Sequence, residues 1–388
     1  GLTHLPDSFA CGIDWSTQPK APKTKGLPIR EFLSTQNAGC AYNCPWCGGS
    51  RDAFRRIFGR HRAMARKPED EVRYEFESMR RLEGVSDYHF YSVGSYNESK
   101  TSLSTFLDHI AETPLKSVSF EQFHLTPDDI LKKMAKANQK VSLTLSPESH
   151  DPFIAKHSGR GVYTNEEMES FIERALDFGI FAIDVWYFVG MPHQTAESAF
   201  ETVAYAEKLL ERFRGKNVNP MVCPMVPFLD PASNIFENPE EYGYTVFFRT
   251  AEEHRRGMEH ASLINRMNYE TKWLSREKLV ETGYLTIKRL MQKKAELGFL
   301  PGSAVLRYCE KIDDARAFIS EVHAADSLPD ASDRARALDA LGDGIVARNE
   351  AIFFHGVANQ ALPVNRQVGG RWFDEFGWDP ETLDAAAG

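Results

Sequence analysis

The 388-residue sequence has only six cysteines, no long apolar run and no excess of positive charge. A membrane-spanning helix needs about 20 consecutive apolar residues, and the sequence contains no run of that length. The N-terminal stretch GLTHLPDSFACGIDWS lacks the basic and then apolar pattern of a signal peptide. A formal net charge of -9 argues against general nucleic-acid binding, which requires a cationic surface. We therefore predict a cytoplasmic protein that has no nucleic-acid or membrane partner.

Three of the cysteines, Cys11, Cys223 and Cys309, lie far from one another in the sequence. This scatter is typical of free thiols in a reducing compartment and not of a disulfide framework. A hydrophobic content of 42% and a charged content of 26% indicate a globular chain, long enough for one large α/β domain with an appendage.

From residue 30 onward, short β-like segments alternate with amphipathic helical segments, which predicts parallel strands joined by crossover helices. The predicted strands span 32–36, 88–93, 116–120, 141–145, 181–189 and 218–226. Helices are predicted at about 69–83, 101–112, 126–139 and 195–213, and the clearest one begins at Asn165 as N-cap and stops at Gly179.

Six strands are too few for a closed eight-stranded barrel. The sixth strand contains Pro220 and Pro224, which cannot donate backbone hydrogen bonds and so favour an edge position. We predict an α/β fold, an open partial (β/α)6 TIM-like barrel with a mainly helical C-terminal extension.

The chain divides into three predicted parts. Residues 1–29 form an N-terminal extension or interdomain linker, residues 30–230 form the partial barrel, and residues 231–388 form a C-terminal helical region. Helices in this last region are predicted at 275–297, 311–325 and 332–353. An open sheet edge has to be covered, and this region is the segment available to cover it.

The stretch CAYNCPWCGGS, residues 40–50, contains three cysteines, Cys40, Cys44 and Cys47. It follows the first predicted strand directly and so lies at the carboxyl end of that strand, where barrel enzymes carry out their chemistry. A closed tetrahedral metal site takes four ligands, whereas three thiolates can hold three irons of a four-iron cluster and leave the fourth iron open.

Two interpretations of these cysteines remain open. Together with His61 they could form a three-cysteine, one-histidine zinc site that staples a binding module. Gly48 and Gly49 favour the cluster, because residues without side chains let the backbone approach a bulky cofactor.

The cysteine spacing, with the aromatic Trp46 before the last cysteine, resembles the radical S-adenosylmethionine (SAM) superfamily. The resemblance implies an enzyme with a [4Fe-4S] cluster whose open iron binds SAM. It also implies reductive cleavage of SAM to a 5'-deoxyadenosyl radical, hydrogen abstraction from a small-molecule substrate, and a flavodoxin or ferredoxin as reductant.

Most of residues 1 to 290 also resembles a bacterial subgroup of these enzymes that usually carries a cobalamin domain. The segments concerned are CPWCGGSRDAFRRIFGR, SPESHD, ENPEEYGYTVFFRTAEEHRRGM and NYETKWLSRE. No Asp-x-His-x-x-Gly cobalamin motif occurs, so no cobalamin domain is visible in the sequence. A cobalamin-dependent methyltransferase is therefore kept as an alternative function.

Under this resemblance, residues at successive strand ends are the candidates for SAM binding. Trp46, Gly48 and Gly49 would lie beside the cofactor, and the candidates that follow strands two to five are Gly94, Ser95, Glu121, Ser146, Glu148, Ser149, Gly190 and Met191. Gly94 and Ser95 are expected at the methionine amino group, and Gly190 and Met191 at the adenine. Taken singly, a Ser or Glu that ends a strand can equally be a helix cap.

His150, His193 and Cys223 are the candidate catalytic residues. Both histidines follow predicted strand ends and could transfer protons, although a hydrogen-bonded loop histidine is the alternative for each. Cys223 could contact the substrate or a radical, or be a small core residue.

The stretch 51–67 contains six arginines and a lysine in an otherwise acidic chain. It predicts either a solvated helix face or a patch that docks an acidic electron donor such as a flavodoxin or holds an anionic group of the substrate.

Overall fold

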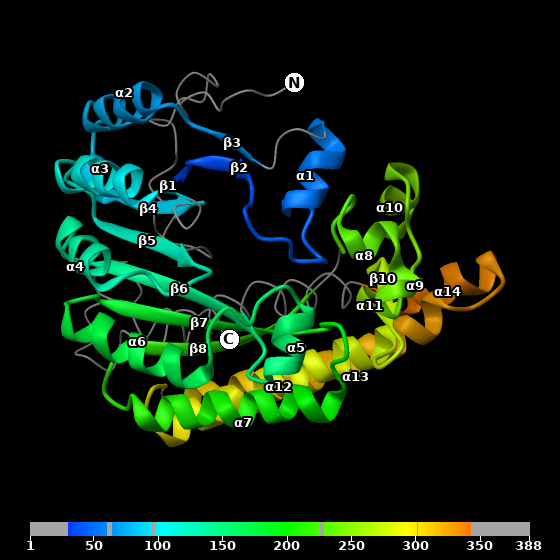
Figure 1. Cartoon of the computed structure of the whole chain (residues 1–388). Helices are drawn as coiled ribbons and strands as arrows, with labels where there is room; N and C mark the ends of the chain where they lie inside the picture. The colour runs from blue at the N-terminus through cyan, green and yellow to red at the C-terminus, as the bar shows by residue number, and fades with distance from the viewer. Residues whose placement is uncertain (1–29, 60–63, 95–97, 226–228, 301, 343–388) are drawn as a thin grey trace.

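A six-stranded parallel sheet forms the centre of the computed structural model, which describes residues 30–59, 64–94, 98–225, 229–300 and 302–342 (Figure 1). The strand order is β1-β4-β5-β6-β7-β8. The strands are β1 (Arg30–Thr35), β4 (Tyr88–Val93), β5 (Ser117–Gln122), β6 (Val141–Glu148), β7 (Ala182–Val189) and β8 (Val218–Pro224). The predicted α/β fold with six parallel strands is confirmed, and the proline-containing β8 lies at an edge as expected.

Helices follow the strands and cover the outer face of the curved sheet (Figure 1). They are α2 (Glu69–Arg80), α3 (Lys100–Ala111), α4 (Asp128–Ala137), α6 (Asn165–Asp177) and α7 (Ala196–Arg212). The N-cap of α6 is Thr164 and not Asn165, because the Thr164 side chain accepts from the Glu167 amide in a capping box. Gly179 follows the end of α6 with φ of 98°, a conformation that favours glycine.

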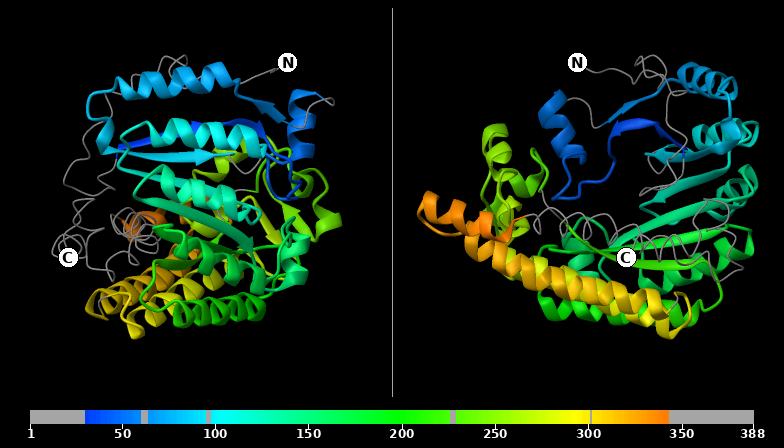
Figure 2. Two further views of the ribbon diagram at one scale, coloured as in Figure 1. Left: turned by 60° about the vertical axis from the view of Figure 1, so that its left-hand side comes forward. Right: turned by 180° about the vertical axis from the view of Figure 1, so that it is seen from behind.

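The two faces of the sheet differ in composition. Outward-facing residues are apolar and fully buried: Phe32, Phe90, Val118, Phe120, Val141, Leu143, Ile183 and Val185. The inward-facing residues line the concave interior of the partial barrel, here called the lumen: His89, Tyr91, Ser117, Ser119, Glu121, Ser142, Thr144, Asp184, Trp186, Phe188, Asn219 and Cys223. Most of the lumen residues keep some exposure. Figure 2 shows the open form of this partial barrel.

The β8 edge is covered by α12 (Arg276–Glu296), which packs on β8 and α7, while α13 (Gly302–Asp326) packs on α12. Gly283 permits this contact, because a Cβ there would lie 3.0 Å from Pro224 Cβ. Lys294 of α12 is fully buried and donates to Asn219 Oδ1 at 2.6 Å. The C-terminal helices therefore protect an edge that would otherwise be exposed.

The remaining C-terminal elements are short. They are α8 (Asn234–Glu237), α9 (Pro239–Tyr242), α10 (Ala251–Gly257), α11 (Leu263–Arg266), α14 (Ala331–Leu341) and the antiparallel pair β9 (Tyr244–Val246) and β10 (Tyr269–Thr271). This part is mostly helical, as predicted, but α13 begins earlier than the expected residue 311. No described helix is long and apolar enough to cross a membrane.

Four short elements near the site were not among the predicted strands and helices, although a helix face was one interpretation of the stretch 51–67. β2 (Asn37–Gly39) pairs antiparallel with β3 (Met64–Arg66), and α1 (Arg51–Phe58) and α5 (Pro152–His157) flank the cysteine stretch. They escape a periodicity search because the strands have three residues each and the helices eight and six, which is too few to show a repeated period.

Candidate functional site

The three cysteines lie on one tight loop, residues 40–50, which joins β2 to α1 and is here called the cysteine loop. Its backbone turns twice, since the Cys47 amide donates to the Cys44 carbonyl and the Ser50 amide to the Cys47 carbonyl, both at 3.2 Å. Ser50 then caps α1 through the Ala53 amide. Cys40 and Cys44 are buried and Cys47 is half-buried. Local hydrogen bonds therefore hold three thiols on a single loop.

A second segment, residues 158–160 between α5 and α6, packs onto the cysteine loop. Trp46 Nε1 donates to the Ser158 carbonyl at 3.1 Å. At Gly159, with φ of 84°, a Cβ would lie only 2.5 Å from Cys44 Cα, so no other residue fits without a shift of the backbone. Arg160 Nη1 donates to Cys44 Sγ at 2.8 Å.

Arg160 also links the cysteine loop to the end of β6. Its Nε donates to Glu148 Oε1 at 2.9 Å and to the Ser146 carbonyl at 3.1 Å, and its guanidinium lies 3.8 Å above the ring of Phe123. Burial raises the pKa of Glu148 to about 7, although Arg160 opposes this shift.

The geometry of Glu148 is suited to a ligand. Its backbone has φ of 67°, an uncommon conformation for a residue other than glycine. Its Oε2 atom is buried and has no hydrogen-bond partner among the described residues. A buried acceptor without a partner costs free energy, and a ligand that donates a hydrogen bond would remove that cost.

The residue types of the cysteine loop, three cysteines, fit an iron–sulfur cluster. Thiolates are the ligands of such clusters, and the loop presents three thiols with a permanent cation against one of them. Burial raises the pKa of Cys44 to about 12 and that of Cys47 to about 11. These two thiols are therefore protonated without metal and would release protons on binding it.

The zinc alternative is not tested, since its fourth ligand, His61, lies outside the described residues. Among the residues that are described, no three His, Cys, Asp or Glu side chains form a group that could hold a metal ion.

The two glycines of the cysteine loop have different surroundings. The amide of Gly48 donates to Asp230 Oδ2 at 2.9 Å, and a Cβ on Gly48 would meet Asp230 Cβ at 3.0 Å. Gly48 thus allows a close approach of Asp230. The position of a Cβ on Gly49 is less restricted, with Cys47 Sγ at 3.7 Å.

Two further predicted cofactor residues lie at the ends of neighbouring strands. Gly94, with φ of 89°, directly follows β4 and accepts a hydrogen bond from Asn37 Nδ2 at 2.8 Å through its carbonyl. Glu121 of β5 accepts from the Tyr91 hydroxyl at 3.0 Å, and burial raises the pKa of its carboxyl. Ser95 lies outside the described residues.

The Gly190–Met191 turn is occupied by protein contacts. The Gly190 amide donates to Gln194 Oε1 at 2.7 Å, and its carbonyl accepts from the Tyr244 hydroxyl at 2.6 Å. A Cβ on Gly190 would lie 2.8 Å from the Tyr269 hydroxyl, and Met191 is fully buried. The adenine contact expected of this turn stays a prediction.

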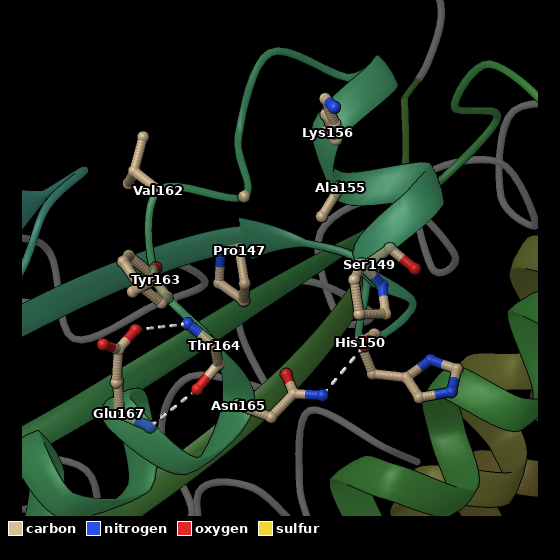
Figure 3. Close-up of a pocket in the computed structure, with 12 residues that line it drawn as sticks. Pro147, Ser149, His150, Ala155, Lys156, Val162, Tyr163, Thr164, Asn165 and Glu167 are labelled. Atoms are coloured by element: carbon tan, nitrogen blue, oxygen red, sulfur yellow. Dashed lines mark hydrogen bonds between the residues drawn. The ribbon is translucent and has the colours of Figure 1, made fainter.

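Ser149 and His150 face the outer helix layer. The Ser149 hydroxyl accepts from the Asp151 amide at 3.1 Å, and His150 Nδ1 lies 2.9 Å from Thr202 Oγ1 of α7. The His150 ring also stacks on Tyr205 of the same helix. Both residues line a pocket of about 320 Å³ between the end of β6, α5 and the start of α6, to which no described residue of the cysteine loop contributes (Figure 3).

His193 and Cys223 have different surroundings. The His193 ring contacts Phe153, His157 and Trp273, so it belongs to an aromatic cluster on α5 and the β10 region. Cys223 of β8 pairs in register with Phe188 and faces the lumen, where burial raises its pKa to about 11. Of the three candidate catalytic residues, Cys223 is the one on the lumen face.

The described part of the basic stretch is not exposed throughout. Lys67 is buried in an ion pair with Glu75, which removes it from any patch. Arg55 and Arg56 of α1 are exposed, although Arg56 also donates to the Ala232 carbonyl at 2.6 Å. Residues 60–63 lie outside the described part of the chain.

Sequence reasoning missed Arg160. His124 follows a predicted strand end like His150 and His193, and its Nδ1 lies 3.1 Å from the hydroxyl of Tyr42 in the cysteine loop. The sequence offers one signal for Arg160, which stands between two glycines, Gly159 and Gly161. In the structure both glycines have positive φ. Two such glycines around a cation indicate a backbone that approaches something closely.

Residues 37–206 match the family model described as the radical SAM superfamily. No curated protein matches the chain. Among solved structures, the radical S-adenosylmethionine methyltransferase TsrM from Kitasatospora setae, with cobalamin and a [4Fe-4S] cluster bound, is 17% identical over 59% of this chain, with a TM-score of 0.45. The chain spans 41% of the length of that protein.

Two other solved structures are similar at the same level. Methylornithine synthase (PylB) is 13% identical, covers 68% of this chain and 62% of its own, and has a TM-score of 0.40. A mutant spore photoproduct lyase with bound AdoMet and dinucleoside spore photoproduct is 13% identical, covers 69% of this chain and 74% of its own, and has a TM-score of 0.45.

Proposed function

Because this chain is a member of the radical SAM superfamily through residues 37–206, we propose that it cleaves SAM reductively and abstracts hydrogen from a small polar substrate. The observation that carries the proposal is the loop with three thiols at the carboxyl end of the sheet, facing a buried carboxylate that has a free acceptor atom. Cys40, Cys44 and Cys47 would hold a [4Fe-4S] cluster. When bound, that cluster supplies the electron that releases a 5'-deoxyadenosyl radical from SAM.

The protein residues around the cluster would bind and orient SAM. Glu148 Oε2 can accept a hydrogen bond from a ribose hydroxyl or an ammonium group, and Glu121 is a second acceptor one strand away. The indole of Trp46, fixed by the Ser158 carbonyl and packed near Phe188, would form a wall of the site. We propose no catalytic role for His150 or His193, because both are engaged outside the lumen.

The lumen is the proposed substrate site. Tyr91, Glu121, Thr144 and Asp184 offer hydrogen-bonding groups on its floor and walls, and Trp186 adds an aromatic surface beside Phe188. These side chains suit a small molecule that has several polar groups and one apolar face. Closing such a radical site to water would be the task of the surrounding helices.

We also propose a flavodoxin or ferredoxin as electron donor and the cytoplasm as location. The exposed arginines 55 and 56 on α1, next to the cysteine loop, would attract an acidic protein, and this attraction would act mainly on the association rate.

The test is anaerobic reconstitution with iron and sulfide, followed by incubation with SAM and dithionite. We expect about four irons per chain and 5'-deoxyadenosine as product. Cys44→Ala should abolish both, whereas Cys309→Ala, which removes a buried thiol in the distant α12–α13 cluster, should retain both.

Two other outcomes would assign a different function. S-adenosylhomocysteine together with 5'-deoxyadenosine, only when cobalamin is added, would identify the cobalamin-dependent methyltransferase. One zinc per chain, without iron–sulfur absorption or SAM cleavage, would identify the binding module.

A further inference from the structure

The contact between Arg160 and Cys44 brings a permanent positive charge to one of the three proposed cluster ligands. Arg160 Nη1 lies 2.8 Å from Cys44 Sγ, a short distance for a nitrogen–sulfur contact. The arginine side chain is 4% exposed, so water screens this charge weakly. Arginine stays protonated at every physiological pH, so the donor is always present.

The direction of the guanidinium is fixed by contacts on its other sides. Arg160 Nε donates to both Glu148 Oε1 and the Ser146 carbonyl, and the guanidinium lies over the ring of Phe123. The backbone before it is fixed as well, because Gly159 lies against Cys44 and Ser158 holds Trp46. An arginine restrained in this way loses little conformational entropy when it donates to sulfur.

A hydrogen bond and a positive charge at a cluster sulfur favour the more negative, reduced cluster. We propose that Arg160 is a positioning residue that raises the reduction potential of the cluster through Cys44, an inference that rests on the proposed function. The segment 158–160 thereby makes electron uptake from a biological donor easier. Glu148 restrains the guanidinium and partly offsets its charge.

The test measures the midpoint potential of the reconstituted cluster by electron paramagnetic resonance, without SAM, so that the result does not depend on turnover. In Arg160→Gln we expect the ratio of reduced to oxidised cluster at a fixed potential to fall about tenfold. For a one-electron couple this corresponds to a shift of about 59 mV to lower potential. Arg160→Lys keeps the positive charge but loses the planar set of guanidinium N–H donors. In this variant the ratio of reduced to oxidised cluster should fall less than in Arg160→Gln.

Lys156→Gln is the matched control. Lys156 is an exposed cation four positions earlier on α5, and its removal should leave the potential unchanged. An Arg160→Gln protein with four irons and the wild-type potential would overturn the inference. If that variant does not assemble a cluster, Arg160→Lys decides, and an unshifted potential there would overturn it equally.

The two proposals can fail separately. Wild-type protein that assembles no cluster contradicts the proposed function and this inference together. Wild-type protein that cleaves SAM, beside an Arg160→Gln variant with an unchanged potential, contradicts this inference alone.

Discussion

The two faces of the same parallel sheet have opposite characters. On β5 the outward Phe120 is fully buried, while its neighbour Glu121 points into the lumen and keeps some exposure. On β7 the outward Ile183 and Val185 are fully buried on either side of the lumen residue Asp184. Parallel sheets are usually apolar on both faces, since both are covered. Here the outer face maintains the fold, and the inner face is available for ligands.

The largest loss of stability should come from a substitution on the outer face of the sheet. Phe120→Ala removes a ring that is 0% exposed in the main core, and we expect a loss of about 3–5 kcal/mol in the free energy of unfolding. Chemical denaturation of metal-free protein measures it. Phe120→Leu is the control and should cost less than Phe120→Ala, because it removes fewer buried atoms and leaves a smaller cavity. If Phe120→Ala lost less free energy of unfolding than Phe120→Leu, this would contradict the conclusion that the outer face stabilises the fold.

An intermediate effect on stability should come from Asp184, a titratable residue that faces the lumen. Burial raises the pKa of Asp184 to about 6 from its usual 3.8, although Asn219 and Lys294 oppose the shift. A raised pKa means that the native state holds the proton more tightly than the unfolded chain. The resulting stability is complete below pH 3.8 and is lost as the pH rises through 6.

Comparison with Asp184→Asn isolates this contribution. Burial lowers the pKa of Lys294 to about 7, and loss of Asp184 would lower it further, so the variant should gain stability as the pH rises. Both effects make the stability difference, wild type minus variant, fall between about pH 4 and pH 6. Denaturation midpoints at pH 4, 5 and 6 check this, and a difference that rises with pH would refute the buried carboxyl.

The smallest loss of stability should come from removing a hydroxyl group that faces the lumen. Ser119→Ala removes a hydrogen bond to Ser142, whose hydroxyl still lies 3.4 Å from the Val118 carbonyl. No buried group is left without a partner there, so we expect a cost of about 1 kcal/mol or less. The same denaturation assay tests it. A loss near that of Phe120→Ala would mean that the lumen face stabilises the fold as much as the outer face does.

The strands and most helices were predictable because their signals are local and repeated. Alternation in β5 and β7 and the caps around α6 place each element to within a few residues. Thr164 takes the cap in place of Asn165 because its hydroxyl completes a reciprocal pair with Glu167, and the sequence offers both candidates side by side. β2 and β3 are three residues each and depend on one another for pairing, so neither has a pattern of its own.

The site was predictable only in part. Cys40, Cys44 and Cys47 are close in sequence, so their spacing alone brings them onto one loop. Ser149 and His150 follow a strand end in the same way as Glu148, yet they face α7 while Glu148 meets Arg160. The pairing register of β6 with β7 shifts between Leu145 and Glu148, and this irregularity changes the direction in which the following side chains point. No pattern in the sequence predicts such a shift at this place.

The sequence by itself determined the three-thiol loop and the positions of the six strands along the chain, because both depend on neighbours within a few residues. Only the tertiary structure decided that Arg160 meets Cys44 across 116 residues and that Lys294 closes the lumen floor beside Asn219. These contacts need the chain to return to a place set by the packing of whole helices and strands. Electrostatic interactions fall off with distance in space and not along the chain, so their partners become known only when the fold is complete.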